Sequence, residues 1–278
     1  MNSSNYGKLI IKNLDSWYTS RKITEITTLV GNRKYGKSYA ASKMQEIYEK
    51  KKWPFGVVDK MGIHYAIRNK FDRVVIIGGD HADYETDEID KYLPLLLDKE
   101  FNFVLDVSEF DDTFAQEFVA EVFEFLWMWH KENKKPRNYF IEESDFFVGQ
   151  IGTLAQVKSA IIKCITKGRM YGFGFTLISQ RYRMIDKTAL AQTDNYVIFN
   201  MKLPLDLSLL TKLIGEDLSM RIKRLKVGVA IIMTDEGHAI YTIGEKETPS
   251  ASSTPEFGVE IKSVDILPLN EEVKRSLK

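Results

Sequence analysis

Apolar residues along the chain gather in short runs that are rich in β-branched and aromatic side chains. Such runs, when they are bounded by polar or turn-forming residues, are typical of buried strands. We therefore expect strands at residues 23–30, 55–59, 73–77, 102–107, 139–143, 173–179 and 196–200.

Helical patterns lie between several of these runs, at residues 38–51, 111–131 and 154–167. The second of them places Phe114, Phe118, Val122, Phe125 and Trp129 at three- and four-residue spacing, which indicates core packing. Alternating strands and helices are typical of a mostly parallel sheet covered on both faces. The pattern predicts an α/β fold.

The pattern changes near the C-terminus. Runs at 229–233 and 239–243 are joined through Asp235, Glu236 and Gly237, a hairpin signal, which predicts a small C-terminal β appendage. The Ser-, Thr- and Pro-rich segment 248–255 is typical of an extended or flexible connector. We expect one large domain at 1–245, with its core at about 23–226 and its appendage at 227–245, followed by a connector and tail at 246–278.

Composition restricts the classes of partner. Of 278 residues, 44% are hydrophobic and 28% charged, and 39 basic residues balance 39 acidic ones, so any contact with a polyanion must be local. The single cysteine, Cys164, excludes an intramolecular disulfide, and its apolar neighbours predict a buried, inert thiol.

No targeting or membrane segment is expected. The N-terminus lacks a signal-like charged and apolar pattern, and no apolar run approaches the roughly 20 residues that span a bilayer. We expect a soluble, cytoplasmic protein without a membrane partner, whether it is cellular or virus-encoded.

The strongest motif is a phosphate-binding loop of the form G-x-x-x-x-G-K-S, directly after an apolar strand and before a helix. Its glycines let successive backbone N–H groups point at phosphates, at the positive end of the following helix. The lysine would contact the β- and γ-phosphates of ATP, and the serine would be a ligand of Mg²⁺. The predicted nucleotide-binding residues are Gly31, Asn32, Arg33, Lys34, Tyr35, Gly36, Lys37 and Ser38.

Such an enzyme also needs an acid near the Mg²⁺ and a base for the attacking water. Glu142 and Glu143 end one predicted strand, and Asp106 lies at the end of another. The paired glutamates supply both roles, so we favour Glu142 for the metal and Glu143 for the water, with Asp106 as the alternative.

Two further residues are candidates for catalysis. Gln180 follows the strand at 173–179 and could sense the γ-phosphate as a polar amide beside the loop. Arg169 precedes a turn with two glycines and could act as an arginine finger, since its planar cation suits the charge that develops on a transferred phosphoryl group.

Four segments in this order resemble the HerA/FtsK superfamily, and its HerA branch in particular. They are the phosphate loop, the acidic strand end at 140–147, the glycine-arginine turn at 168–174 and the strand end at 177–181, and the similarity extends over roughly residues 23–243. The resemblance implies a RecA-like P-loop NTPase core, dependence on ATP and Mg²⁺, and a ring, commonly a hexamer, that translocates double-stranded DNA. It implies that Glu142 serves the metal, Glu143 the water, Gln180 the sensor role, and Arg169 a neighbouring subunit's nucleotide.

Two departures from that family qualify the expectation. About two dozen residues precede the first predicted core strand, too few for the N-terminal β-barrel of HerA, so a nuclease partner docked on a barrel is in doubt. Glu142 stands where P-loop ATPases most often have aspartate. Small members without a barrel include genome-packaging ATPases of viruses, so packaging is an alternative function, as is a nucleotide-gated assembly subunit of a larger effector complex. A small-molecule phosphotransferase built on the same loop is a third, less favoured reading, since no separate substrate-binding motif is evident.

DNA contacts would have to come from local basic clusters, because phosphate contacts supply most sequence-independent affinity. Candidates lie on the third predicted helix and before the hairpin: Lys158, Lys163, Lys167, Arg221, Lys223, Arg224 and Lys226. Solvated helix faces explain these residues equally well.

Overall fold

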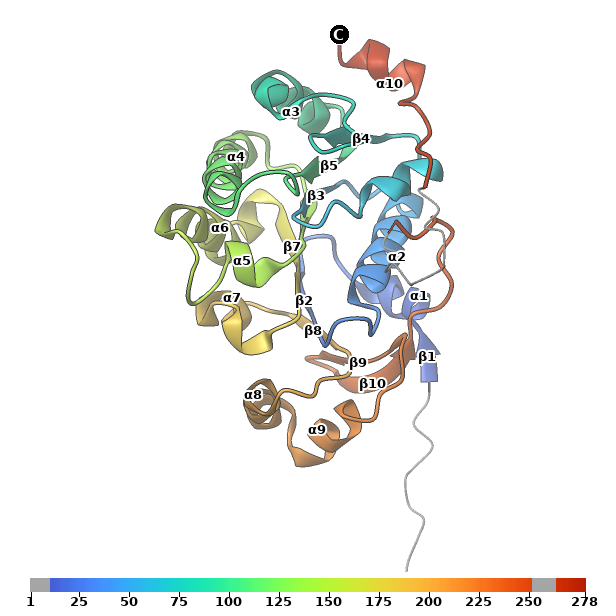
Figure 1. The fold of residues 1–278 in the computed structure, drawn as a ribbon, viewed down its shortest axis with the longest axis vertical. Helices are drawn as coiled ribbons and strands as arrows, with labels where there is room; N and C mark the ends of the chain where they lie inside the picture. Colours follow the sequence, from blue (N-terminus) through green and yellow to red (C-terminus); the bar gives the residue numbers. More distant parts are fainter. Residues whose placement is uncertain (1–10, 252–263) are drawn as a thin grey trace, which may run out of the picture.

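The computed structural model describes residues 11–251 and 264–278, whose strands form one ten-stranded sheet in the order β1-β10-β9-β8-β2-β7-β6-β3-β5-β4 (Figure 1). The strands are β1 (Ile11–Asn13), β2 (Ile26–Val30), β3 (Phe55–Asp59), β4 (Val74–Ile77), β5 (Asn102–Asp106), β6 (Arg137–Ile141), β7 (Phe173–Ser179), β8 (Asn195–Ile198), β9 (Val229–Thr234) and β10 (Gly237–Thr242). All described pairings are parallel except those of β9 with β8 and β10. The predicted α/β fold with a mostly parallel sheet is confirmed.

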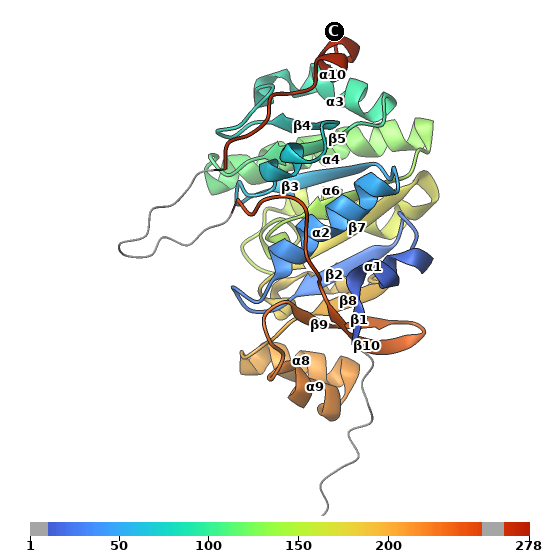
Figure 2. The ribbon, with the colours of Figure 1, turned by 90° about the vertical axis from the view of Figure 1, so that its right-hand side faces the viewer.

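Helices cover both faces of this sheet. The α-helices are α1 (Leu14–Trp17), α2 (Lys37–Lys50), α3 (Ile89–Asp98), α4 (Asp112–Asn133), α5 (Ser144–Phe147), α6 (Ala155–Lys167), α7 (Lys187–Ala191), α8 (Pro204–Ile214), α9 (Glu216–Ile222) and α10 (Glu271–Ser276). Short 3₁₀ helices are η1 (Tyr18–Ser20), η2 (Tyr65–Asn69), η3 (Thr86–Glu88), η4 (Arg169–Tyr171) and η5 (Tyr182–Met184). Figures 1 and 2 show α1 and α2 on one face, and α4 and α6 on the other.

Successive residues of each strand enter different cores because side chains alternate across a sheet. In β4, Val75 and Ile77 pack with α3 and α4, whereas Val74 and Ile76 pack with α2 and η2. Burial on both faces explains why the strands appear in the sequence as continuous apolar runs.

The first core strand begins later than predicted, at Ile26 instead of residue 23. Glu25 donates its N–H to the carbonyl of Lys22 at 3.1 Å, so a turn precedes the strand. The predicted hairpin is present as β9 and β10, and it extends the central sheet because β9 pairs with β8.

The C-terminal segment contacts the core on both sides of the undescribed residues. Glu46 of α2 accepts hydrogen bonds from the backbone of Glu247 and Thr248 at 2.8 and 2.7 Å. Leu269, Val273 and Leu277 are buried in the core that includes α3. Residues 252–255 of the predicted connector lie outside the described residues, and the domain boundary at 245 stays a prediction.

Candidate functional site

The phosphate loop connects the carboxyl end of β2 to α2. Gly36, at φ 105°, adopts a left-handed conformation that favours glycine. Asn32 N–H donates to the carbonyl of Asn200 at 2.8 Å, and the carbonyl of Tyr35 accepts from Gly228 N–H at 3.2 Å. The segments after β8 and before β9 therefore brace the loop. Because α2 begins at Lys37, its unpaired N-terminal amides make this end an anion site.

Lys37 lies inside the loop. Its Nζ donates to the carbonyl of Asn32 at 3.1 Å, and the residue is buried. Burial lowers the pKa of Lys37, while the carboxylates of Glu142, Glu143 and Asp145 act in the opposite direction. The loop cation thus faces a cluster of acids across the space where phosphates would bind.

Strand order brings the acidic strand end to the loop. Since β7 alone separates β2 from β6, the carboxyl ends of these three strands are neighbours. Ser38 Oγ donates to Glu142 Oε1 at 2.7 Å. A hydroxyl and a carboxylate in contact form an oxygen donor set of the kind that Mg²⁺ prefers.

The competing acid, Asp106, lies on β5, beyond β6 and β3. It accepts a hydrogen bond from Ser108 N–H at 2.9 Å. Burial, with a further contribution from the Asp59 carboxylate, raises the pKa of Asp106. The geometry therefore favours Glu142 over Asp106 as the acid beside Ser38.

Glu143 and Gln180 meet at the same edge. Glu143 has a left-handed backbone, φ 49° and ψ 52°, at the turn from β6 into α5. Gln180 Nε2 donates to Glu143 Oε1 at 2.5 Å. Burial raises the pKa of Glu143, and Asp145 and Glu142 add to the shift, against the opposing effects of Gln180 and Lys37. A raised pKa suits a carboxylate that accepts a proton.

A cavity of about 260 Å³ opens beside this pair. Its lining residues come from the loop, from the ends of β6 and β7, and from the segment before α8: Asn32, Arg33, Glu143, Asp145, Gln180, Arg181 and Leu203. Sequence reasoning missed Asp145, which accepts from Ser179 Oγ at 2.6 Å and so ties α5 to the end of β7. Its position directly after the paired glutamates was the available signal.

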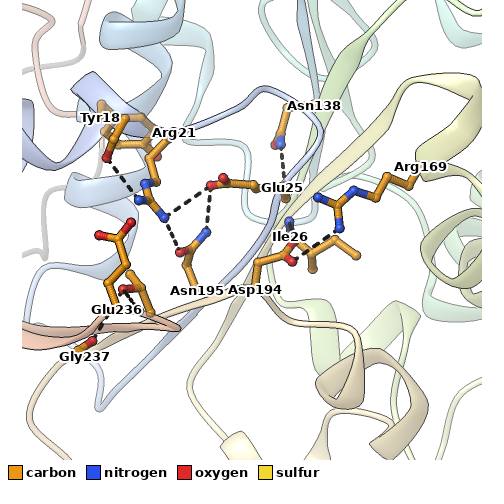
Figure 3. A network of polar contacts seen from close by, with 12 residues as sticks. Tyr18, Arg21, Glu25, Ile26, Asn138, Arg169, Asp194, Asn195, Glu236 and Gly237 are labelled. Carbon is orange, nitrogen blue, oxygen red and sulfur yellow. Dashed lines mark hydrogen bonds and ion pairs between the residues drawn. The ribbon is translucent and has the colours of Figure 1, made fainter.

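Arg169 lies in η4, just before β7, at the opposite ends of the strands from the phosphate loop. Figure 3 shows its side chain beside Asp194. Arg169 precedes β7, whose seven residues span roughly 20 Å before reaching the site. Its side chain is 64% exposed and pairs with Asp194 at 3.7 Å, while Asp194 also accepts from Ile26 N–H at 2.8 Å. The structure thus brings Glu142, Glu143 and Gln180 to the phosphate loop and leaves Arg169 away from it.

A second polar network lies at the same ends of the strands. Arg21 Nη1 donates to Asn195 Oδ1 at 3.0 Å, and Asn195 Nδ2 donates to Glu25 Oε2 at 3.0 Å (Figure 3). These contacts tie the segment after η1 to the starts of β2 and β8. No sequence motif pointed to them.

The basic clusters differ in their surroundings. Lys163 pairs with Glu124 and lies 5.2 Å from the centroid of the Trp127 ring, so a structural role accounts for it. Lys223, Arg224 and Lys226 are exposed near the start of β9. The second cluster is the more accessible of the two.

Within the described ranges, none of the helices has the length and apolar character needed to cross a membrane. No protein-family model and no curated protein sequence matches the chain.

Solved structures do match. The genome packaging NTPase B204 from Sulfolobus turreted icosahedral virus 2, in complex with AMPPCP, is 18% identical, with a TM-score of 0.56, over 79% of this chain and 98% of that chain. VirB4 of Thermoanaerobacter pseudethanolicus is 12% identical, with a TM-score of 0.59, over 80% and 90%. The pCW3 conjugation coupling protein TcpA with ATPγS is 10% identical, with a TM-score of 0.50, over 80% and 62%.

These likenesses are likenesses of fold. The chain has the RecA-like α/β fold that the resemblance to the HerA/FtsK superfamily implied, and at the level of the fold that expectation is confirmed.

Proposed function

We propose that this protein hydrolyses ATP and uses the energy to move double-stranded DNA as a ring-forming motor. The observation that carries the proposal is the convergence of Ser38, Glu142, Glu143 and Gln180 beside Lys37. A binding module would need only the phosphate loop. The added acid and amide pair supports hydrolysis.

The residues divide the reaction among them. Lys37 and the loop amides would bind the phosphates, and Ser38 and Glu142 would hold Mg²⁺. When bound, Mg²⁺ neutralises charge on the phosphates. Glu143 accepts the proton of the attacking water, and Gln180 contacts both Glu143 and the cavity where the γ-phosphate would lie.

The position of Arg169 supports a ring. An exposed arginine roughly 20 Å from its own loop is too far away to reach its own nucleotide, so as an arginine finger it would act on a nucleotide held by another subunit. We expect a hexamer, and size-exclusion chromatography with light scattering, with and without ATP and Mg²⁺, tests it. A monomer under all conditions would contradict this part of the proposal.

Packaging of a viral genome is the second candidate. It is supported by the likeness to B204, whose structure this chain covers over 98% of its length. In either role, sequence-independent and strongly salt-dependent binding to duplex DNA is expected.

The deciding experiment measures the rate of ATP hydrolysis with and without duplex DNA, with Lys37→Ala as the inactive control. Strong stimulation by DNA supports a motor. Stimulation only by a second protein would support the nucleotide-gated assembly subunit, and DNA binding that is absent or insensitive to salt would count against translocation.

A further inference from the structure

A buried histidine lies behind the acid that faces Ser38. His64 Nε2 is 3.4 Å from Glu142 Oε2, whereas Ser38 Oγ contacts the other oxygen, Oε1, at 2.7 Å. The two oxygens of one carboxylate are thus shared between the phosphate loop and a residue outside it.

The contact of His64 Nδ1 with Gln45 determines whether Nε2 carries the proton of the neutral ring. Gln45 Nε2 lies 2.9 Å from His64 Nδ1, closer than Gln45 Oε1 at 3.3 Å. An amide nitrogen can only donate, so Nδ1 accepts and the proton of the neutral ring is on Nε2, facing Glu142. Gln45, His64 and Glu142 are 0%, 1% and 3% exposed, so water does not replace these contacts.

The turn that carries His64 is held by the last residue of β3. The carboxylate of Asp59, at the end of that strand, accepts hydrogen bonds from the N–H groups of Met61, Ile63 and His64 at 3.0, 2.8 and 2.7 Å. Three bonds to one carboxylate fix the turn that carries His64. The position of the imidazole is therefore set by bonds other than its own contact with the Glu142 side chain.

These contacts form a chain of side chains that starts and ends on α2. Ser38 and Gln45 both belong to α2, and the path from one to the other passes through Glu142 and His64. If Ser38 Oγ were to bind a metal ion, its hydrogen bond to Glu142 would be given up, and the contact with His64 would still orient the carboxylate. Partners behind a metal-side carboxylate orient it and commonly contribute 10- to 100-fold in metal affinity.

We propose that His64, oriented by Gln45, is a positioning residue that holds Glu142 toward the Mg²⁺ of the bound nucleotide. The inference rests on the proposed function, since it assumes nucleotide binding at the loop. It adds a residue that touches neither nucleotide nor metal.

Two substitutions separate the hydrogen bond from the bulk of the ring. The amide nitrogen of His64→Gln reaches the position of Nε2 and can still donate to Glu142. That of His64→Asn lies near Nδ1 and cannot. His130→Asn is the matched control, because His130 is also fully buried but contacts Tyr139 and Tyr171 at the far edge of the sheet.

The measurement is the binding of a methylanthraniloyl-labelled ATP, followed by fluorescence, first in EDTA and then during titration with Mg²⁺. We expect His64→Asn to raise the half-saturating Mg²⁺ concentration about 10-fold or more, with metal-free affinity unchanged. His64→Gln and His130→Asn should stay within about twofold of wild type, a margin well below the loss expected for an outer-shell partner.

Three results would overturn the inference. One is an unchanged Mg²⁺ requirement in folded His64→Asn, and another is an equal loss in His64→Gln, which would indicate packing of the ring instead of its donor. Failure of wild-type protein to bind the nucleotide at all would overturn the proposed function and the inference with it, so the two failures are distinguishable.

Discussion

Replacing Glu143 by glutamine should stop ATP hydrolysis and leave ATP binding intact. The amide keeps an oxygen that can accept from Gln180 Nε2, as Glu143 Oε1 does at 2.5 Å, so the substitution removes the base with little change of geometry. A general base contributes roughly 10²- to 10⁴-fold to a rate, or about 3 to 5 kcal/mol of the activation free energy. Loss of one carboxylate beside Glu142 and Asp145 also lessens repulsion of the triphosphate, so affinity should hold or increase.

Phosphate release and binding of labelled ATP are measured on the same preparations. Asp106→Asn is the matched comparison, because Asp106 is the other acid at a neighbouring strand end and bonds to Ser108 instead of Ser38. Its hydrolysis rate should stay near that of wild type. Hydrolysis by Glu143→Gln within about threefold of wild type, far from the loss of a general base, would refute the assignment. Loss of hydrolysis in Asp106→Asn alone would transfer the role to β5.

The acidic limb of the rate profile follows from the same residue. Glu143 must be deprotonated to accept a proton, and burial raises its pKa. As the pH is lowered, the rate of hydrolysis should therefore begin to fall at a higher pH than it would with a glutamate of ordinary pKa, about 4.3. Glu143→Gln should remove this limb from any residual activity.

Three further predictions concern other parts of the molecule. Lys37→Ala should weaken ATP binding by about 100-fold or more while the melting temperature is kept, since burial already disfavours the charged lysine; equal affinity by fluorescence titration would contradict this. Arg169→Ala should leave ATP binding unchanged and reduce the rate of hydrolysis about 10³-fold. If the arginine acts in a neighbouring subunit's site, mixing Arg169→Ala subunits with Glu143→Gln subunits should restore hydrolysis, and no recovery would argue against action between subunits. Burial lowers the pKa of His130 to about 4, so below pH 6.5 the unfolded chain binds more protons than the folded one, and the free energy of unfolding should fall by on the order of 3 kcal/mol from pH 6.5 to 4. Denaturant unfolding of wild type and His130→Gln at both pH values checks this, and an equal pH dependence in the two proteins would show that His130 is not the cause.

Local patterns in the sequence were sufficient for every described strand except β1, for the helices α2, α4 and α6, and for the phosphate loop, whereas α3, α8 and α9 were not predicted. Glycines, lysine and serine at fixed spacing after an apolar run specify a tight turn and the start of a helix, because both depend on consecutive residues. The ends of strands were less well predicted. Ile23 has the side chain of a strand residue, but a turn closed between Lys22 and Glu25 delays β2 to Ile26.

The choice among acids was left open by the sequence. Glu142 and Asp106 both end buried strands, and their distances along the chain from Ser38 do not say which lies beside it. The strand order does, because β7 alone stands between β2 and β6, whereas β5 lies two strands beyond β6. Strand order is set by packing of the whole sheet.

The partners of the site had no signal at all in the sequence. A lone histidine at 64, a glutamine at 45 and an asparagine at 200 are unremarkable until folding places them against Glu142 and the phosphate loop. Phosphate-binding chemistry can be predicted from the sequence alone, because the residues that supply it are consecutive. The acids, amides and imidazole that surround the loop depend on the folded arrangement, because buried polar groups must find partners across elements that lie far apart in the chain.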